Sequence, residues 1–238
     1  MAMPTIHIHG AAAVLAGGVA TGEGALARAA MLLHPGEAGN ELDGFDPKPY
    51  VSTVKGYLDG AAKYALAAAS LALGERREQL PERREAVGVV SASRWGAPES
   101  GFRFLQQLAS KGPRHASPLV FPHSYPNTAG NLVAMEFRFA GPHVVYLGPE
   151  GAREALHCAA AILERRQASH ILLVVCEAAI PQALPEEIHP VNGAIALWLS
   201  ADPADALDSI HVPDTSAKPS PNGAVADLLA TLNPTESP

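Results

Sequence analysis

The stretch from Phe139 to Glu177 constrains the fold more than any other part of the sequence. Val144–Leu147 is rich in β-branched and aromatic residues, which favours a strand. Apolar residues at helical spacing follow up to about Gln167. His170–Cys176 is then a nearly continuous apolar run, as in a strand covered on both faces. The pattern predicts a strand–turn–helix–strand unit inside an α/β domain.

The turn of this unit consists of Gly148, Pro149, Glu150 and Gly151. Many enzymes place a nucleophile in such a turn, because the unpaired N–H groups at a helix start favour an anion. None of the four residues carries a serine hydroxyl or a cysteine thiol. The sequence therefore predicts a turn of catalytic shape without a nucleophile of either kind.

The remaining elements follow from periodicity and from the positions of glycine and proline. Further strands are predicted over Thr5–His9, Ala86–Ala92 and Gly193–Ser200. Helices are predicted over Thr53–Leu73 and over Ser100–Ser110, the second with Phe102 or Phe104, Leu105 and Leu108 facing inward. A third helix is predicted to begin behind a cap at Asn127 or Thr128 and to end at about Glu136. Loops are predicted over residues 32–52, Glu75–Glu85 and Lys111–Pro126. The proline-rich end, Ala201–Pro238, predicts a loose tail with one short helix over Val225–Leu232.

Composition limits the class of protein. The 238 residues, 47% of them apolar, suit one domain, and a net charge of −7 argues against nucleic acid or an anionic membrane as the main partner. No run is apolar enough for a membrane span, and the start lacks the basic region of a signal peptide. Cys158 and Cys176 fall in predicted core elements, which predicts reduced thiols in a cytoplasmic protein.

No metal or cofactor is predicted from the residues. His7 and His9 share one face of the first strand, but two histidines without a nearby third ligand are weak evidence for a metal site. No glycine-rich phosphate-binding loop with the G-x-x-x-x-G-K pattern is present. The loop histidines His115, His123 and His189 have no nucleophile paired with them in the sequence.

Several short motifs carry a resemblance to a known family. They are Pro126-Asn127, Ala129-Gly130, Gly141-Pro142, Ala155-Leu156-His157 with Cys158-Ala159, and the run from Ala168 to Leu173 with Glu177. In this order they resemble the N-terminal half of β-ketoacyl synthases of the thiolase-like fold, over Thr5 to Ser200. The resemblance implies an α/β fold: a single half of a thiolase-like fold, with a mixed sheet covered by helices and without the second half. It divides the chain into a synthase-like domain over residues 1–200 and a tail over 201–238. Gly193–Ser200 resembles the first strand of the missing half.

The resemblance also implies where function lies. The acylated cysteine of the family falls near Pro149, so no catalytic residue carries over, and Cys158, about two turns into the helix, is the remaining candidate nucleophile. In the family, the strand after Gly-Pro pairs with its counterpart across a dimer. This implies a partner interface at Phe139, Gly141, Pro142, His143, Val144, Val145 and Tyr146, and acyl-tunnel positions at Phe104, Phe121, Tyr125 and Phe137.

Three functions fit these expectations. The first is a non-catalytic partner, like a chain-length factor of type II polyketide or aryl-polyene systems, of a catalytic β-ketoacyl synthase in fatty acid, polyketide or aryl-polyene biosynthesis. An acyl carrier protein is its second expected partner. The alternatives are a self-associating module that binds acyl groups or carrier protein, and a stand-alone acyltransferase or hydrolase that uses Cys158 or a loop histidine. A single half is also expected to expose an apolar sheet face, which marks an interface.

Overall fold

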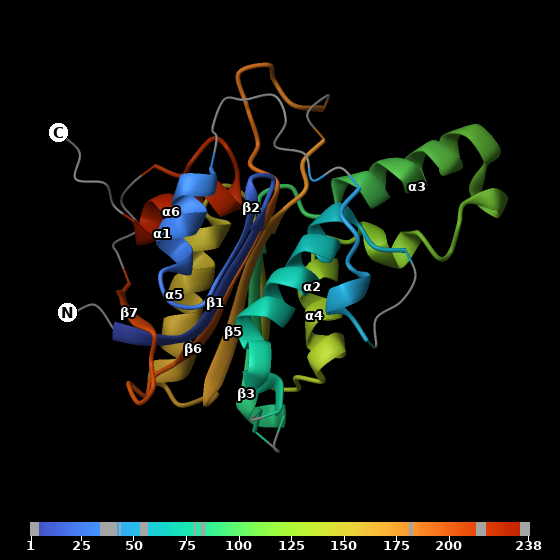
Figure 1. Cartoon of the computed structure of the whole chain (residues 1–238). Coiled ribbons are helices and arrows are strands. Elements are labelled where there is room, and N and C mark those ends of the chain that lie inside the picture. The colour runs from blue at the N-terminus through green and yellow to red at the C-terminus, as the bar shows by residue number, and fades with distance from the viewer. Residues whose placement is uncertain are drawn as a thin grey trace.

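A seven-stranded mixed sheet forms the centre of the computed structural model, and helices cover both of its faces (Figure 1). The structure describes residues 5–33, 42, 44–52, 57–78, 80–81, 84–180, 183–212 and 218–233. The strand order is β2-β1-β6-β5-β3-β4, with β7 also paired to β1. Helices α2 and α4 lie on one face, and α1, α5 and α6 lie on the other.

The elements alternate as expected for an α/β chain. The strands are β1 Thr5–Leu15, β2 Gly18–Thr21, β3 Val87–Ser93, β4 His143–Leu147, β5 His170–Glu177, β6 Gly193–Ser200 and β7 Asp208–His211. The helices are α1 Ala25–Leu32, α2 Gly60–Leu73, α3 Pro98–Lys111, α4 Thr128–Phe137, α5 Gly151–Glu164 and α6 Ala224–Leu232. The short 3-10 helices are η1 Lys48–Tyr50, η2 Gly74–Glu78, η3 Arg84–Ala86, η4 Pro113–His115 and η5 Phe121–Ser124.

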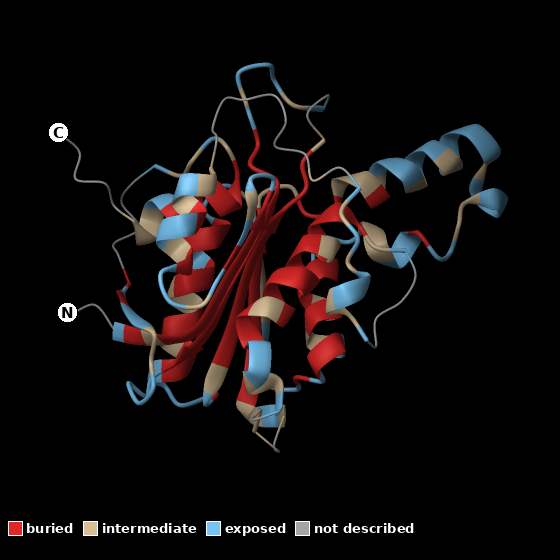
Figure 2. Ribbon diagram, viewed as in Figure 1, coloured by how far each residue is buried: buried red, intermediate tan, exposed pale blue. Residues whose placement is uncertain are grey.

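Burial is concentrated in the sheet and the inward faces of its helices (Figure 2). Every residue of β3 and β6 is buried. The alanine-rich α2 packs closely on the sheet because its small side chains let the backbones approach. The predicted bare apolar sheet face is therefore wrong: both faces are covered within this chain.

The first strand is longer than predicted and contains a bulge. β1 runs on to Leu15 and turns into β2, although the sequence predicted an end at Gly10. Its pairing with β6 shifts between Ile8 and Gly10, so His9 and Gly10 lie opposite Trp198. A side chain at Gly10 would overlap the carbonyl oxygen of Ala72 in α2, so only glycine fits there.

Two predictions for the C-terminal part of the chain are wrong. β6 does not begin a second half, because it hydrogen-bonds to β1 on one side and to β5 on the other in this sheet. The predicted loose tail folds over its described residues: β7 pairs with β1, and α6 packs in the core against α5. Proline content misled the prediction, since the prolines of this segment lie between β7 and α6 and around them.

Three helix predictions need correction. α2 begins at Gly60 behind the capping carboxylate of Asp59, later than the predicted Thr53, which lies outside the described residues. Asn127 stands at the start of α4, but its side chain makes no capping hydrogen bond. α3 projects from the body of the molecule (Figure 1), so Phe102, Leu105 and Leu108 are exposed and not inward as predicted. Phe104, the alternative to Phe102, does pack, against Phe121.

Candidate functional site

The turn predicted to lack a nucleophile lies at the carboxyl ends of the parallel strands β3, β4 and β5. In open α/β sheets this edge is where ligands usually bind. Gly148 adopts a φ of 122° and its N–H donates to the carbonyl of Ser93, which ties the turn to β3. Pro149 and Glu150 are exposed, and α5 begins at Gly151. The turn has the expected shape and carries no serine or cysteine.

A buried carboxylate organises the same edge. Glu177, at the end of β5, is 0% exposed and accepts hydrogen bonds from the Ser93 hydroxyl and the N–H groups of Arg94, Trp95 and Ala224. Burial raises the pKa of Glu177, while these donors lower it. The carboxylate thus joins three segments: the loop after β3, the end of β5 and the start of α6.

The segment from Lys218 to Ala224 crosses this edge and is held by two arginines. Arg153, in the first turn of α5, donates to the Lys218 carbonyl and forms a 2.7 Å ion pair with the buried Asp227. Arg94 donates to the Ser220 carbonyl at 2.8 Å. This segment therefore lies beside the turn, in a position that the sequence did not predict. The isolated acids Glu177 and Asp227, each inside an apolar run, were the signal for such buried partners.

Neither cysteine replaces the missing nucleophile in the turn. Cys176 is 1% exposed, and burial raises the pKa of its thiol far above the usual range, so the thiol stays protonated. Cys158 lies inside α5, and its thiol is close enough to the Tyr146 hydroxyl of β4 to affect the pKa of that hydroxyl. Burial and that contact raise the pKa of Tyr146 to about 12. Both cysteines are free thiols, as predicted.

Six of the seven predicted interface residues lie at or just before the edge strand β4, and one lies in the core. His143, Val144, Val145 and Tyr146 lie on β4, which among the described residues pairs with β3 alone and so forms one edge of the sheet. Gly141 and Pro142 precede it and hydrogen-bond through their backbones to β3. Phe139 is instead a core residue that stacks on Trp198 at 5.8 Å between ring centroids.

The predicted acyl-tunnel residues also separate. Phe104, Phe121 and Tyr125 form one aromatic cluster on the projecting part of the chain, with successive centroids 5.0 Å apart. Phe137 is buried in the core beneath the guanidinium of Arg77, 4.9 Å from its ring centroid, and is not part of that cluster. We call residues 98–126, which include α3, η4 and η5, the α3 arm.

The α3 arm carries most of the exposed large apolar side chains of the described residues. The exposed ones are Phe102, Leu105, Leu108, Leu119, Phe121 and Tyr125. Phe102 is 63% exposed and Leu105 is 60% exposed. At the base of the arm, Gly96 lies against Pro126 and Leu147, so the apolar surface continues to the end of β4. Contiguous apolar surface of this kind marks an interaction site.

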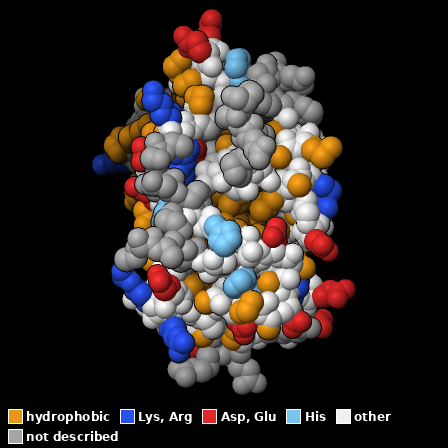
Figure 3. Space-filling model, turned by 90° about the vertical axis from the view of Figure 1, so that its left-hand side faces the viewer, with side chains coloured by type: hydrophobic (Ala, Val, Ile, Leu, Met, Phe, Trp, Pro, Cys, Tyr) orange, Lys and Arg blue, Asp and Glu red, His pale blue; other side chains and the backbone are white. Residues whose placement is uncertain are grey.

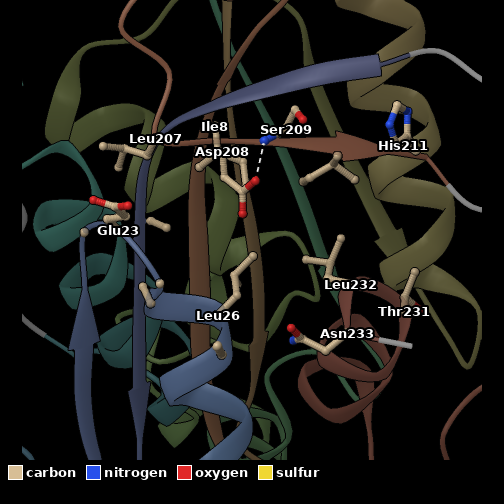
Figure 4. Close-up of a pocket in the computed structure, with 16 residues that line it drawn as sticks. Ile8, Glu23, Leu26, Leu207, Asp208, Ser209, His211, Thr231, Leu232 and Asn233 are labelled. Atoms are coloured by element: carbon tan, nitrogen blue, oxygen red, sulfur yellow. Dashed lines mark hydrogen bonds between the residues drawn. The ribbon is translucent and has the colours of Figure 1, made fainter. Parts of the chain in front are cut away.

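A cavity of about 360 Å³ opens on the other side of the molecule, among α1, β7 and α6. Figure 3 shows hydrophobic side chains inside a hollow near the middle of this face. Leu26 and Leu232 line it, and the carboxylate of Asp208 faces the same space (Figure 4). The cavity is separate from the turn after β4 and contains none of the predicted site residues.

The described ranges contain neither a metal-binding group nor a membrane-spanning helix. No group of three or more histidine, cysteine, aspartate or glutamate side chains there is arranged to hold a metal ion. No helix in the same ranges is both long and apolar enough to cross a membrane.

Asp59 near the base of the α3 arm predicts a pH dependence of stability. Its buried carboxylate accepts from the N–H groups of Ala61 and Ser100, and burial raises its pKa to about 6. Folding therefore takes up a proton between about pH 4 and 6, and the free energy of unfolding falls by about 2–3 kcal/mol as pH rises through this window. Asp59→Asn should flatten this part of the profile in urea unfolding at several pH values. Parallel profiles for the two proteins would contradict the assignment.

Comparison with known proteins agrees with this architecture. The β-ketoacyl synthase N-terminal domain family matches residues 58–233. A search of curated proteins by sequence finds no match. Among solved structures, the chain is similar to the ishigamide ketosynthase/chain length factor, with a TM-score of 0.63, 18% identity, and 83% of this chain and 62% of that chain covered.

Two further structures show the same fold. One is a type II polyketide synthase acyl-carrier protein in complex with its ketosynthase bound to the hexaketide: TM-score 0.64, 15% identity, 83% of this chain and 62% of that chain covered. The other is a ketosynthase in complex with its chain length factor from Xenorhabdus doucetiae: TM-score 0.57, 18% identity, 84% and 80% covered.

These matches identify the sheet and its helices as the N-terminal half of a thiolase-like fold. The chain spans 62% of the length of the first two structures, so the likeness covers one part of such proteins. The family match covers well over half of the 238 residues, including the turn, the α3 arm and α6. The chain therefore belongs to the β-ketoacyl synthase family and matches its N-terminal domain.

Proposed function

We propose that this protein is a non-catalytic partner of a catalytic β-ketoacyl synthase, comparable to a chain-length factor, in polyketide, aryl-polyene or fatty acid biosynthesis. The observation that carries the proposal is the continuous surface formed by the α3 arm and the edge of β4. The turn without serine or cysteine supports it, because a partner must then supply the thiolate that carries the acyl group. A cytoplasmic location belongs to the same proposal.

The edge of β4 supports pairing with another chain. In the described part of the chain, β4 forms its strand pairing with β3 alone, and its three central residues are partly exposed. Another strand added at this edge would extend the sheet and cover backbone groups that otherwise remain open. Burial lowers the pKa of His143, at the start of β4. This imidazole therefore stays neutral at neutral pH and adds no charge to the edge of β4.

The aromatic cluster of the α3 arm supports a role in shaping an acyl tunnel. Phe104, Phe121 and Tyr125 present rigid rings next to the exposed apolar residues of α3. Rings of this size at a subunit boundary limit the length of a chain that grows between the subunits, and this requires shape but no nucleophile. Two of the similar structures are named as ketosynthase with chain length factor, and one as a complex with acyl-carrier protein. An acyl carrier protein is the second partner that we propose.

Co-expression with a complete synthase of the same pathway tests the proposal. We expect a 1:1 complex by native mass spectrometry, and condensation activity only when the synthase is present. The isolated chain should gain no covalent mass from an acyl thioester, and Cys158→Ala should leave this result unchanged because that thiol lies within α5. An acyl adduct on the isolated chain, with turnover, would show the stand-alone acyltransferase or hydrolase instead.

A self-associating module is the second candidate, and the same surface favours it. A sheet edge beside an apolar arm is self-complementary across a two-fold axis, which is the commonest symmetry of dimers. In that case the purified chain forms a stable homodimer that binds acyl carrier protein without a synthase. Light scattering of the chain alone, and then with the synthase added, separates the two: the partner hypothesis expects the heterodimer to replace any homodimer.

A further inference from the structure

A second cavity, of about 430 Å³, lies at the end of the sheet where β5 begins and β6 ends. The eight residues of β5 separate this end from the turn after β4 by about 25 Å. We call it the imidazole pocket, because His9 and His170 both line it. Its other lining residues are Arg76, Leu80, Pro81, Ser169, Trp198, Ser200, Asp202, Ala204 and Asp205.

The sheet fixes the positions of the two histidines. His9 belongs to the bulge of β1, which puts it opposite Trp198 of β6 and leaves it 8% exposed. His170 is the first residue of β5, and its ring stacks on Trp198 with centroids 4.7 Å apart. The two imidazoles meet edge to face at 6.3 Å. Bulges commonly direct side chains at functional sites, and this one brings a histidine from the start of the chain to β5.

Hydrogen bonds determine which nitrogen of each ring carries its proton. His9 Nε2 lies 2.9 Å from the Asp202 carbonyl oxygen, which only accepts, so Nε2 is the donor. His170 Nδ1 lies 3.1 Å from the Ser169 hydroxyl, which itself donates to the Ala86 carbonyl, so Nδ1 is the donor there. In the neutral rings, His9 Nδ1 and His170 Nε2 therefore carry lone pairs and act as acceptors. Protonation of each ring turns that nitrogen into a donor.

The charges around the pair depend on that protonation. Arg76 of η2 lines the pocket on one side, and Asp202 and Asp205 line it after β6. With neutral imidazoles, the lining carries one guanidinium and two carboxylates; with both rings protonated, it carries three cations and the same two carboxylates. Burial lowers the pKa of His170, the nearby His9 lowers it further, and Asp202 raises it, so His170 is neutral at neutral pH. Arg166 lines an adjoining groove that shares Asp202.

We propose that the imidazole pocket binds a doubly charged oxyanion of the sulfate or phosphate class, and that binding takes up protons on His9 and His170. Among the lining residues, the protonated imidazoles and the guanidinium of Arg76 are the cationic donors available for charge-assisted hydrogen bonds to such an anion. A metal ion suits the pocket less, because no third histidine, cysteine or carboxylate ligand joins the pair among the described residues. The site is independent of the synthase partner, since it lies at the other end of the sheet.

Inorganic sulfate is the sharpest probe, because its charge is constant between about pH 5.5 and 8. Titration calorimetry of the full chain should show binding at least about tenfold tighter at the lower pH, with net proton uptake revealed by buffers of different ionisation enthalpy. His9→Gln and His170→Asn should each weaken binding about tenfold and reduce this pH dependence. Arg76→Gln should weaken binding at both pH values. His115→Gln, an exposed histidine of the α3 arm, is the matched control.

Equal affinity at both pH values, or variants that bind sulfate like the unchanged protein, would overturn the proposal. Histidine NMR of the unchanged chain keeps the test informative if a variant fails to fold. Sulfate should move the ring signals of His9 and His170 and leave that of His115 in place. Zn²⁺ binding to the pair without any response to sulfate would identify a metal site and reject the anion site.

Discussion

Phe102→Asp combined with Leu105→Asp is expected to abolish the complex with the synthase, because the dissociation constant should rise by about 100-fold or more. The two side chains are 63% and 60% exposed and lie one helical turn apart on α3. In the proposed complex they become buried, so two carboxylates there lose their hydration without a partner. In the isolated chain they stay in water, and thermal unfolding should shift little.

The matched control places the same two charges on exposed apolar residues of other elements. Val19 of β2 and Met31 of α1 are 50% and 79% exposed. Val19→Asp combined with Met31→Asp should leave the complex intact, as judged by surface plasmon resonance against the immobilised synthase. Loss of binding in the control pair alone would move the interface to the face formed by α1 and contradict the proposal.

Glu177→Ala is expected to destabilise the fold by on the order of 3–5 kcal/mol, the largest effect of any single change proposed here. The substitution removes the acceptor of the Ser93 hydroxyl and of the N–H groups of Arg94, Trp95 and Ala224. These donors stay inside the protein, where water does not replace the lost bonds. The midpoint of thermal unfolding should fall by roughly 10 °C.

Two comparisons isolate the cause of that loss. Glu177→Gln keeps one acceptor oxygen and should lose less stability than alanine. Glu154→Ala, at an exposed position of α5, should change the free energy of unfolding by less than about 0.5 kcal/mol. If the unfolding midpoint of the Glu177→Ala protein lies within about 2 °C of that of the unchanged protein, the buried carboxylate does not stabilise this edge.

Strands and helices with strong patterns were predictable from the sequence alone. The apolar run after His170 and the turn before α5 appear where the patterns placed them, and so does β6. The order of strands was not predictable in the same way. β6 lies between β1 and β5, and no local pattern indicates pairing between segments so far apart.

Exposure and long-range polar contacts were the harder part of the site. The apolar spacing of α3 predicts a buried face, and only the position of the helix outside the main body shows that Leu105 faces water. The prolines near Ser220 suggested a loose tail, yet Arg94 and Arg153 hold that segment through backbone carbonyls, which any sequence offers. The position of His9 opposite Trp198 likewise depends on a bulge that only the pairing register reveals.

The place of β6 has a consequence during synthesis. β1 is synthesised long before its central partner β6, because the paired residues of the two strands lie about 180–190 positions apart in the chain. Until residues 193–200 are translated, β1 has only its hairpin with β2 on one side, and its other edge stays open to water and to other nascent chains. The topology therefore leaves this edge of β1 unpaired for most of synthesis, and pairing with other chains is possible during that interval.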